Sequence, residues 1–443
     1  MVRSALVAVM LAPTSAHAGQ ATCSNPGLPV GAAASSDLMP GRLTLNLTTG
    51  LLPIHSELVL DEAQGPVLYD TRLTLLETRL AGEYAILPWL AVGFVAPYRL
   101  VDVGVTHRDP SSGAMVPPPS SIHARTETLR GIGDPSVSVH VAREVGAYRL
   151  HLRLGTSIPL GTTVEDPFLL GNIGQEHQHI QLGTGTFIPS VAIEAQRSIA
   201  NLTVAGWALA QLSLYDNAKG FRASDRFSGG LSASSGLGLR DWTFSLAVEG
   251  HGENSETWQG VVHEDEGNAG RFDFLTGVGT AWRPMRNLAV VADVKLPVYS
   301  HVVGSQLDYG VVAGIGIVGT FDLARRPSWR GLDRETVGPA GRAAALVPVT
   351  GRITVFDLWA DWCAPCRELD DKLAVLAAAH PDRLAVRKLD VIDNDSAAWK
   401  QLLAPGTFEL PHVKVFAADG TLLFERTAPP AELVRAIEAV LKR

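Results

Sequence analysis

The sequence predicts a chain of two unlike parts, an antiparallel transmembrane β-barrel of about twelve strands followed by a smaller α/β domain. Three observations predict this multidomain fold. Residues 41–321 return repeatedly to strict alternation of apolar and polar side chains, whereas residues 341–443 alternate apolar strands with helical patterns. The third observation is length, because 443 residues exceed what a single hydrophobic core normally holds.

The composition limits the class of protein. Apolar residues make up 46% of the chain and charged residues 19%, a balance that excludes intrinsic disorder as its main character. The net charge is −8, and Lys and Arg do not cluster. Because nucleic-acid binding needs clustered cations that neutralise phosphates, we expect no nucleic-acid partner.

Residues 1–18 have the pattern of an export signal peptide. A short basic start precedes an apolar run, and Ala16 and Ala18 form the small-x-small pattern that signal peptidase cleaves. The apolar run is much shorter than the ~20 residues of a membrane-spanning helix, so we expect cleavage after Ala18, with a retained anchor as the alternative. Residues 19–40 then form an N-terminal segment, in which Cys23 is an unpaired thiol, a thiol that pairs transiently with Cys363, or a lipid-modified residue.

The alternation in residues 41–321 has the length expected of membrane-crossing strands. It is clearest in five windows, at residues 43–47, 148–158, 242–248, 288–296 and 307–321. Such runs approach the roughly 9 to 11 residues that a tilted transmembrane strand needs. We expect strands near residues 41, 71, 88, 133, 147, 185, 200, 227, 241, 272, 286 and 308. A soluble β-sandwich or solenoid remains the alternative, because alternation alone permits it.

The expected connections alternate between short and long. Short ones lie near residues 87, 144, 197, 239 and 283, and long ones at residues 52–70, 101–132, 159–183, 214–226, 251–271 and 299–306. In outer-membrane barrels the short turns face the periplasm and the long loops face outside. Both ends of the barrel segment would then lie on the periplasmic side, and so would the domain that follows it.

Two Gly- and Pro-containing phrases carry a family resemblance. "RGIGDPSVSVHVA" and "GTSIPLGTT", together with the aromatic-ended last strand, resemble a family of outer-membrane transporters. The resemblance implies a barrel in the outer membrane, in contact with its lipid. Six polar side chains would face the lumen, where they either select solutes or bond to one another: Arg149, His151, Arg153, Glu249, Asp293 and Lys295.

The histidines of the expected long loops do not have metal-ligand spacing. Four of them lie near glutamates in the sequence, namely His177, His179, His251 and His263. Because no Cys-x2-Cys or His-x3-His pattern accompanies them, we interpret them as solvated loop residues and expect no metal and no cofactor.

The α/β domain follows a change of composition. Residues 322–340 lose the alternation and gain Arg, Pro and Gly, as expected of a linker. In residues 341–443 we expect strands and helices in the order β-α-β-α-β-β-α, at residues 353–359, 364–379, 384–390, 396–403, 412–416, 422–425 and 430–441. A Cys-x-x-Cys pair lies where the first strand meets its helix.

This pair carries the second resemblance. The run Trp362-Cys363-Ala364-Pro365-Cys366 resembles the Trp-Cys-Gly-Pro-Cys active site of the thioredoxin family, with Ala in place of Gly. The resemblance covers residues from about 340 to 443. It implies a redox-active disulfide between Cys363 and Cys366, with Trp362 and Pro365 beside the bound substrate.

The same resemblance assigns roles to four further residues. Asp357 falls on the family's buried acid, six residues before the first cysteine, and Lys388 falls on its partner lysine. Leu410 and Pro411 fall on the family's cis-proline dipeptide, which binds substrate. One departure is that "RTAPP" replaces the glycine expected before the last helix, which leaves that side of the substrate groove undefined.

Physical chemistry supports these roles. A thiolate at a helix N-terminus is stabilised by free N–H groups and the helix dipole, so Cys363 is the expected nucleophile and Cys366 the resolving thiol. Burial in an apolar strand should raise the pKa of Asp357, which suits it to exchange a proton with Cys366. Half of a zinc site is the alternative for the two cysteines, but the remaining ligands are missing.

The sequence therefore predicts an outer-membrane-anchored, periplasmic thiol:disulfide oxidoreductase. Its partners would be periplasmic protein thiols or disulfides and, if it is reducing, an electron donor from the inner membrane, because the periplasm is kept oxidising. The alternative is an outer-membrane transporter or channel whose thioredoxin-like tail has a regulatory or assembly role.

Overall fold

The computed structural model describes residues 38–442, except 63–64, 118–125, 200–201, 240, 264–267, 286, 304–308, 324–327, 361–362, 394 and 404–409. The expected signal peptide, Cys23 and Trp362 lie outside the described residues. Within them, none of the helices has the length and apolar character needed to cross a membrane.

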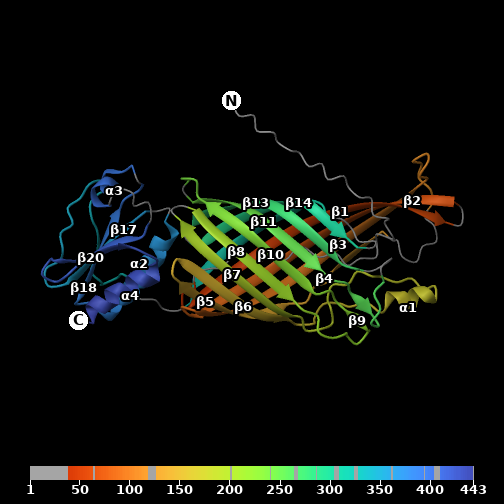
Figure 1. Cartoon of the computed structure of the whole chain (residues 1–443), viewed down its shortest axis with the longest axis horizontal. Helices are drawn as coiled ribbons and strands as arrows, with labels where there is room; N and C mark the ends of the chain where they lie inside the picture. Colours follow the sequence, from red (N-terminus) through yellow and green to blue (C-terminus); the bar gives the residue numbers. More distant parts are fainter. Residues whose placement is uncertain are drawn as a thin grey trace, which may run out of the picture.

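The N-terminal part is a closed antiparallel β-barrel (Figure 1). Its strands are β1 (Arg42–Glu62), β2 (Gly65–Leu87), β3 (Leu90–Arg108), β5 (Ser136–Val145), β6 (Tyr148–Ser157), β7 (Pro189–Ile199), β8 (Leu202–Gln211), β10 (Arg226–Ser235), β11 (Trp242–Glu253), β13 (Arg271–Met285), β14 (Leu288–Val302) and β15 (Val312–Asp322). The sheet has 13 strands, but β4 (Glu127–Ile132) pairs only with β3, so the ring holds twelve. The first and last of these close it, with Arg42 opposite Asp322. The predicted fold class and strand number are confirmed.

The outer face of the ring is apolar and the lumen is polar. On β6, Leu150, Leu152 and Leu154 are 40%, 37% and 53% exposed, whereas His151 between them is 5% exposed. A soluble sandwich would bury the leucines and expose the histidine. The opposite arrangement is that of a strand with lipid on one side and a polar lumen on the other, which excludes the sandwich alternative.

The two ends of the barrel differ. The tight turn between β5 and β6 consists of Gly146 and Ala147, and this turn lies at the end of the barrel that faces the α/β domain. The opposite end carries α1 (Pro167–Asn172) and the short pairing of β9 (Phe221–Arg222) with β12 (Thr257–Trp258) (Figure 1). Short turns and long connections thus lie at opposite ends of the barrel, as expected.

Two of the expected loops are strand instead. The pairing of β1 with β2 continues from Leu43 opposite Tyr84 to Glu62 opposite Gly65, so residues 52–62 are not a loop, and β3 likewise continues to Arg108. The strands extend because an apolar cluster lies inside the barrel at the end opposite the α/β domain, and this cluster gives the extended strands an inner face to bury. Its residues are Leu52, Ile54, Tyr69, Leu73, Leu75, Val101, Val103, Val105, Ile180, Tyr309 and Val312.

The C-terminal part is a five-stranded sheet in the order β16-β18-β17-β19-β20. Its strands are β16 (Arg334–Thr336), β17 (Ile353–Trp359), β18 (Leu384–Asp390), β19 (His412–Phe416) and β20 (Leu422–Thr427); its helices are α2 (Ala364–Ala379), α3 (Ala397–Leu402) and α4 (Pro430–Leu441). The expected order of elements is confirmed. β16 is an addition, because it lies in the segment 322–340 that we expected to be a linker, yet it pairs in parallel with β18.

Each face of this sheet has its own core. The core under α2 and α4 includes Val355, Val386 and Val413, and the core on the other face includes Phe356 and Leu358. Because side chains alternate along β17, Asp357 lies on the same face as Val355, beneath α2. The central strand thus places an acid in a dry layer next to the helix that carries the cysteines.

Candidate active site

The two cysteines form a disulfide at the start of α2. Their sulfurs are 1.98 Å apart, and Cys363 and Cys366 are 2% and 0% exposed. Cys363 is the N-cap residue, and its Sγ accepts a hydrogen bond from the backbone N–H of Cys366 at 3.1 Å. Pro365 fits the first turn because the first N–H groups of a helix need no carbonyl partner within it. The first turn therefore holds one sulfur at the positive end of the helix dipole, where a thiolate is stabilised.

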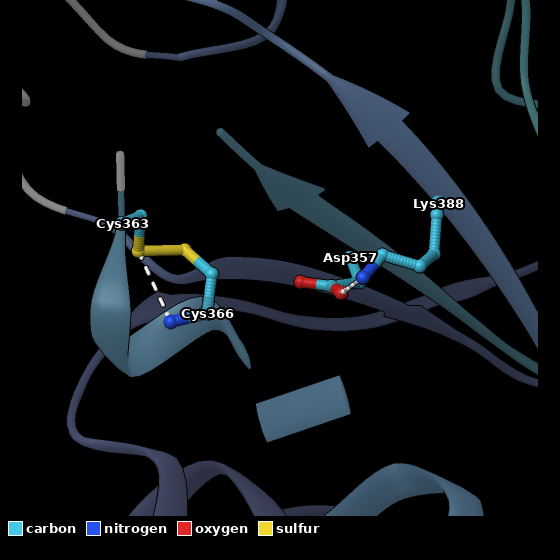
Figure 2. Close-up of a disulfide and its surroundings, with 4 residues drawn as sticks. All are labelled: Asp357, Cys363, Cys366 and Lys388. Atoms are coloured by element: carbon cyan, nitrogen blue, oxygen red, sulfur yellow. Dashed lines mark hydrogen bonds and ion pairs between the residues drawn. A yellow bond between two sulfur atoms is a disulfide. The ribbon is translucent and has the colours of Figure 1, made fainter. Parts of the chain in front are cut away.

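Asp357 lies beneath this turn. It is directly opposite Lys388 in the pairing of β17 with β18, and Lys388 Nζ lies 3.4 Å from Asp357 Oδ2. Figure 2 shows the Asp357 carboxylate between Lys388 and the Cys366 side of the disulfide. Burial raises the pKa of Asp357 to about 6, and Lys388 opposes part of that rise. A carboxyl with such a pKa can give up or take a proton near neutral pH.

The substrate-binding residues that the resemblance implies lie in part beside the disulfide. Leu410 packs against Ala360 and the two cysteines. The Leu410–Pro411 peptide bond is cis, the geometry that the resemblance implied, and Pro411 is buried. Pro365 is half-buried.

Three neighbours of the site were not predicted from the sequence. Lys388 Nζ lies 3.1 Å from Asp370 Oδ1 on α2 and 4.4 Å from the centre of the Trp359 ring. Arg334 Nη2 on β16 lies 3.4 Å from the same Asp370 oxygen. Asp370 had a sequence signal, because it follows Cys366 by one helical turn and so shares its face of the helix. The position of Arg334 had no such signal in the sequence, because its strand lies in the segment that we expected to be a linker.

The polar side chains of the lumen bond largely to one another. His151 Nδ1 lies 2.8 Å from Nε2 of His140, and Arg153 Nη2 lies 3.0 Å from Glu83 Oε2. Farther round the ring, Lys295 Nζ donates to Glu249 Oε2 at 2.8 Å. Of the two possibilities left open for these residues, mutual pairing is the one that the structure favours.

Three of the four histidines that we interpreted as solvated loop residues are not solvated loop residues. His177 and His179 are 4% and 7% exposed, because their segment folds back so that Ile180 joins the apolar cluster inside the barrel. His251 is not in a loop at all, since β11 continues to Glu253. Its Nε2 lies 3.2 Å from Glu249 Oε2 in the lumen.

One group of side chains could be considered for a metal ion. Ligand atoms of His55, Glu57 and Asp70 lie within 4.8 Å of one another. However, Nε of Arg72 and Nε of Arg108 lie 3.7 and 4.0 Å from the Asp70 carboxylate. Because these cations already neutralise the acid and would repel a metal ion, we assign no metal to this group.

Comparison with known proteins identifies the fold of the C-terminal part. Residues 346–417 match the family model for thioredoxin, so the C-terminal part contains a thioredoxin domain. A thiol:disulfide interchange protein, CycY of Rhizobium leguminosarum bv. viciae, is 27% identical over 129 residues, which are 24% of this chain and 68% of that protein. A thioredoxin of Staphylococcus aureus is 38% identical over 52 residues, 12% of this chain and 50% of that protein.

Among solved structures, an outer membrane channel from Pseudomonas putida F1 resembles the barrel. The match covers 65% of this chain and 99% of the channel, with 10% identity and a TM-score of 0.44.

Proposed function

We propose that this chain is an outer-membrane-anchored thiol:disulfide oxidoreductase, whose Cys363–Cys366 pair exchanges disulfides with proteins in the periplasm. The observation that carries the proposal is the disulfide at the N-terminus of α2, with the carboxyl of Asp357 beneath it and a raised pKa on that carboxyl. A thiolate at a helix N-terminus and a nearby proton acceptor are what thiol–disulfide exchange requires.

In the reducing direction, two thiol–disulfide exchange steps follow one another. The Cys363 thiolate attacks one sulfur of a substrate disulfide, forms a mixed disulfide and releases the other substrate sulfur as a thiolate, which takes up a proton. Cys366 then gives its proton to Asp357 and attacks Sγ of Cys363. The Cys363–Cys366 disulfide forms, and the second substrate sulfur leaves as a thiol after protonation. Two electrons pass to the substrate, and a reduced dithiol donor must return them.

The barrel supports the periplasmic location. The α/β domain lies at the end with the short turns, and in outer-membrane barrels that end faces the periplasm (Figure 1). The connection from β15 to β16 spans residues 323–333, at most about 40 Å when extended. The dithiol would therefore work close to the inner face of the outer membrane. A donor that delivers electrons from the inner membrane would be its partner, because the periplasm is kept oxidising.

Reduction of insulin by the detergent-solubilised full-length protein tests the activity. With dithiothreitol as electron source, Cys363→Ser should reduce the rate to that of dithiothreitol alone. Cys366→Ser should retain the attacking thiol and accumulate mixed disulfides that a non-reducing gel resolves. Insulin reduction that survives Cys363→Ser would rule out Cys363 as the nucleophile.

The alternative function is a transporter or channel with a regulatory or assembly thioredoxin-like tail, and the closed ring of strands favours it. Alkylation trapping in cells separates the two functions. A dithiol that is always oxidised, together with a Cys366→Ser variant that captures no partner, would support the channel.

A further inference from the structure

A second buried carboxylate lies beside the Asp357–Lys388 pair. Lys388 Nζ is 3.4 Å from Asp357 Oδ2 and 3.1 Å from Asp370 Oδ1. Asp357 is 0% exposed and Asp370 is 9% exposed. One lysine therefore serves two carboxylates that are both withdrawn from water. The negative charge of Asp370 disfavours ionisation of Asp357 and so raises the pKa of Asp357.

Arg334 supplies a second positive charge. Its strand pairs with β18 so that Thr336 lies opposite Lys388, which puts Arg334 on the same face of the sheet. Arg334 Nη2 is 3.4 Å from Asp370 Oδ1, and its guanidinium lies 5.2 Å from the centre of the Trp329 ring. Trp329 packs against the core under α2 and α4, so it holds the arginine in place. Two carboxylates and two cations then sum to zero charge.

The charged and titratable groups around Asp357 come from three of the elements packed against it. Lys388 comes from β18, Asp370 and the cysteine pair come from α2, and Arg334 comes from β16. The other flanking strand, β19, places the uncharged Val413 opposite Asp357. The charge of Asp357 is thus governed by three side chains from three different elements.

We propose that Arg334 is a positioning residue of the redox site: it neutralises Asp370, so that Lys388 stays paired with Asp357 and the Asp357 carboxylate stays available to exchange a proton with Cys366. This role rests on the proposed thiol–disulfide chemistry. The two outer charges act in opposite directions, since Asp370 raises the pKa of Asp357 and Arg334 lowers it. Arg334 lies outside the segment that matches the thioredoxin family model, residues 346–417. The connection from the barrel therefore supplies part of the electrostatics of the site.

The pH dependence of cysteine alkylation tests this proposal. Full-length protein is reduced in detergent, and the rate at which iodoacetamide modifies Cys363 is followed by mass spectrometry across the pH range. Arg334→Gln should move the profile to higher pH by about half a unit or more, because it leaves a net negative charge near the thiols. Asp370→Asn should move it to lower pH. The double variant, which removes one charge of each sign, should return close to the wild-type profile.

Controls separate charge from structure. Arg334→Lys keeps the charge and should keep the wild-type profile. Arg426→Gln breaks another arginine–carboxylate pair of the domain, the exposed one with Glu432, and should shift nothing. Equal shifts in Arg334→Gln and Arg334→Lys, or shifts of the same sign in Arg334→Gln and Asp370→Asn, would overturn the proposal. If Arg334→Gln unfolds the domain, Asp370→Asn still decides, because the proposal fails unless that profile moves to lower pH.

Alkylation needs no protein substrate, so its outcome is separate from the proposed function. Failure to reduce insulin, combined with the expected shifts in alkylation, would contradict the oxidoreductase activity and leave the charge network intact. Insulin reduction without those shifts would do the reverse.

Discussion

Arg149 Nη2 of the barrel donates a hydrogen bond to Glu368 Oε2 of α2 across 3.4 Å. The arginine follows the tight turn between β5 and β6, and the glutamate is two residues past Cys366. A second pair, Arg42 Nη2 with Asp371 Oδ2 at 3.4 Å, joins the start of β1 to the same helix. The helix that begins at the dithiol therefore rests on the short-turn end of the barrel through two charge pairs.

We expect charge reversal at this contact to release the domain from the barrel. In Arg149→Glu, the new carboxylate would face Glu368 and Glu144, and amide hydrogen exchange in α2 should rise several-fold in the folded full-length protein. Both pairs are partly buried and are therefore screened less than exposed pairs, so 1 M salt should produce a smaller effect in the wild type. Glu368→Arg added to Arg149→Glu should restore protection.

The matched control is Arg283→Glu, near another short turn, where the arginine donates to Thr243 of the barrel instead. Exchange in α2 should not change in this variant. If Arg149→Glu also leaves exchange unchanged at low salt, the charge pairs do not hold the domain against the barrel.

The outer face of β6 provides a test of the membrane barrel. Leu152→Arg should cost about 2–4 kcal/mol if this position lies near the middle of the bilayer, and should reduce the amount of heat-modifiable protein in the outer membrane fraction. Leu152→Val keeps the side chain apolar and should assemble normally. A soluble protein would tolerate an arginine at this exposed position, so undiminished yield of Leu152→Arg would argue against a lipid-facing surface.

Helix α2 offers a pair of positions that separate burial from helix propensity. Leu373 is 0% exposed in the core of the α/β domain, and Val375 on the same helix is 52% exposed. We expect Leu373→Ala to destabilise the domain by about 2–5 kcal/mol and Val375→Ala to change its stability by less than about 0.5 kcal/mol. The midpoint of urea unfolding measures both, with exposure of Cys366 to a maleimide as the signal in reduced protein. Similar midpoints for the two variants would mean that α2 does not pack as described.

The sequence predicts those features of the fold and the site that depend on residues close together in the chain. The faces of β6 follow from local alternation, because lipid and lumen impose opposite preferences on successive residues such as Leu152 and His151. The cysteine pair at the start of α2 also follows from local pattern. These features need no knowledge of the rest of the chain.

What the sequence does not predict depends on contacts between distant segments. The β1–β2 hairpin extends past residue 52 because its inner face meets Ile180 and Tyr309, far along the chain. The same folding back buries His177, which its place in an expected long loop suggested was solvated. Arg334 reaches Asp370 only because a three-residue strand pairs with β18, a pairing too short to leave a periodic pattern.

The buried acid of the redox site should give the domain a characteristic pH dependence. The pKa of Asp357 is raised from 3.8 to about 6 in the folded protein, chiefly by burial. Well below pH 3.8 the carboxyl is protonated in both states and contributes no penalty. As the pH rises toward 6 the unfolded chain ionises first, so the folded state loses stability, by about 3 kcal/mol in total at 1.36 kcal/mol per pKa unit. Asp357→Asn cannot ionise, and urea midpoints measured from pH 4 to 7 should lose this component of their slope. A wild-type midpoint that is flat across this window, or one that rises as steeply in Asp357→Asn, would contradict a raised pKa at Asp357.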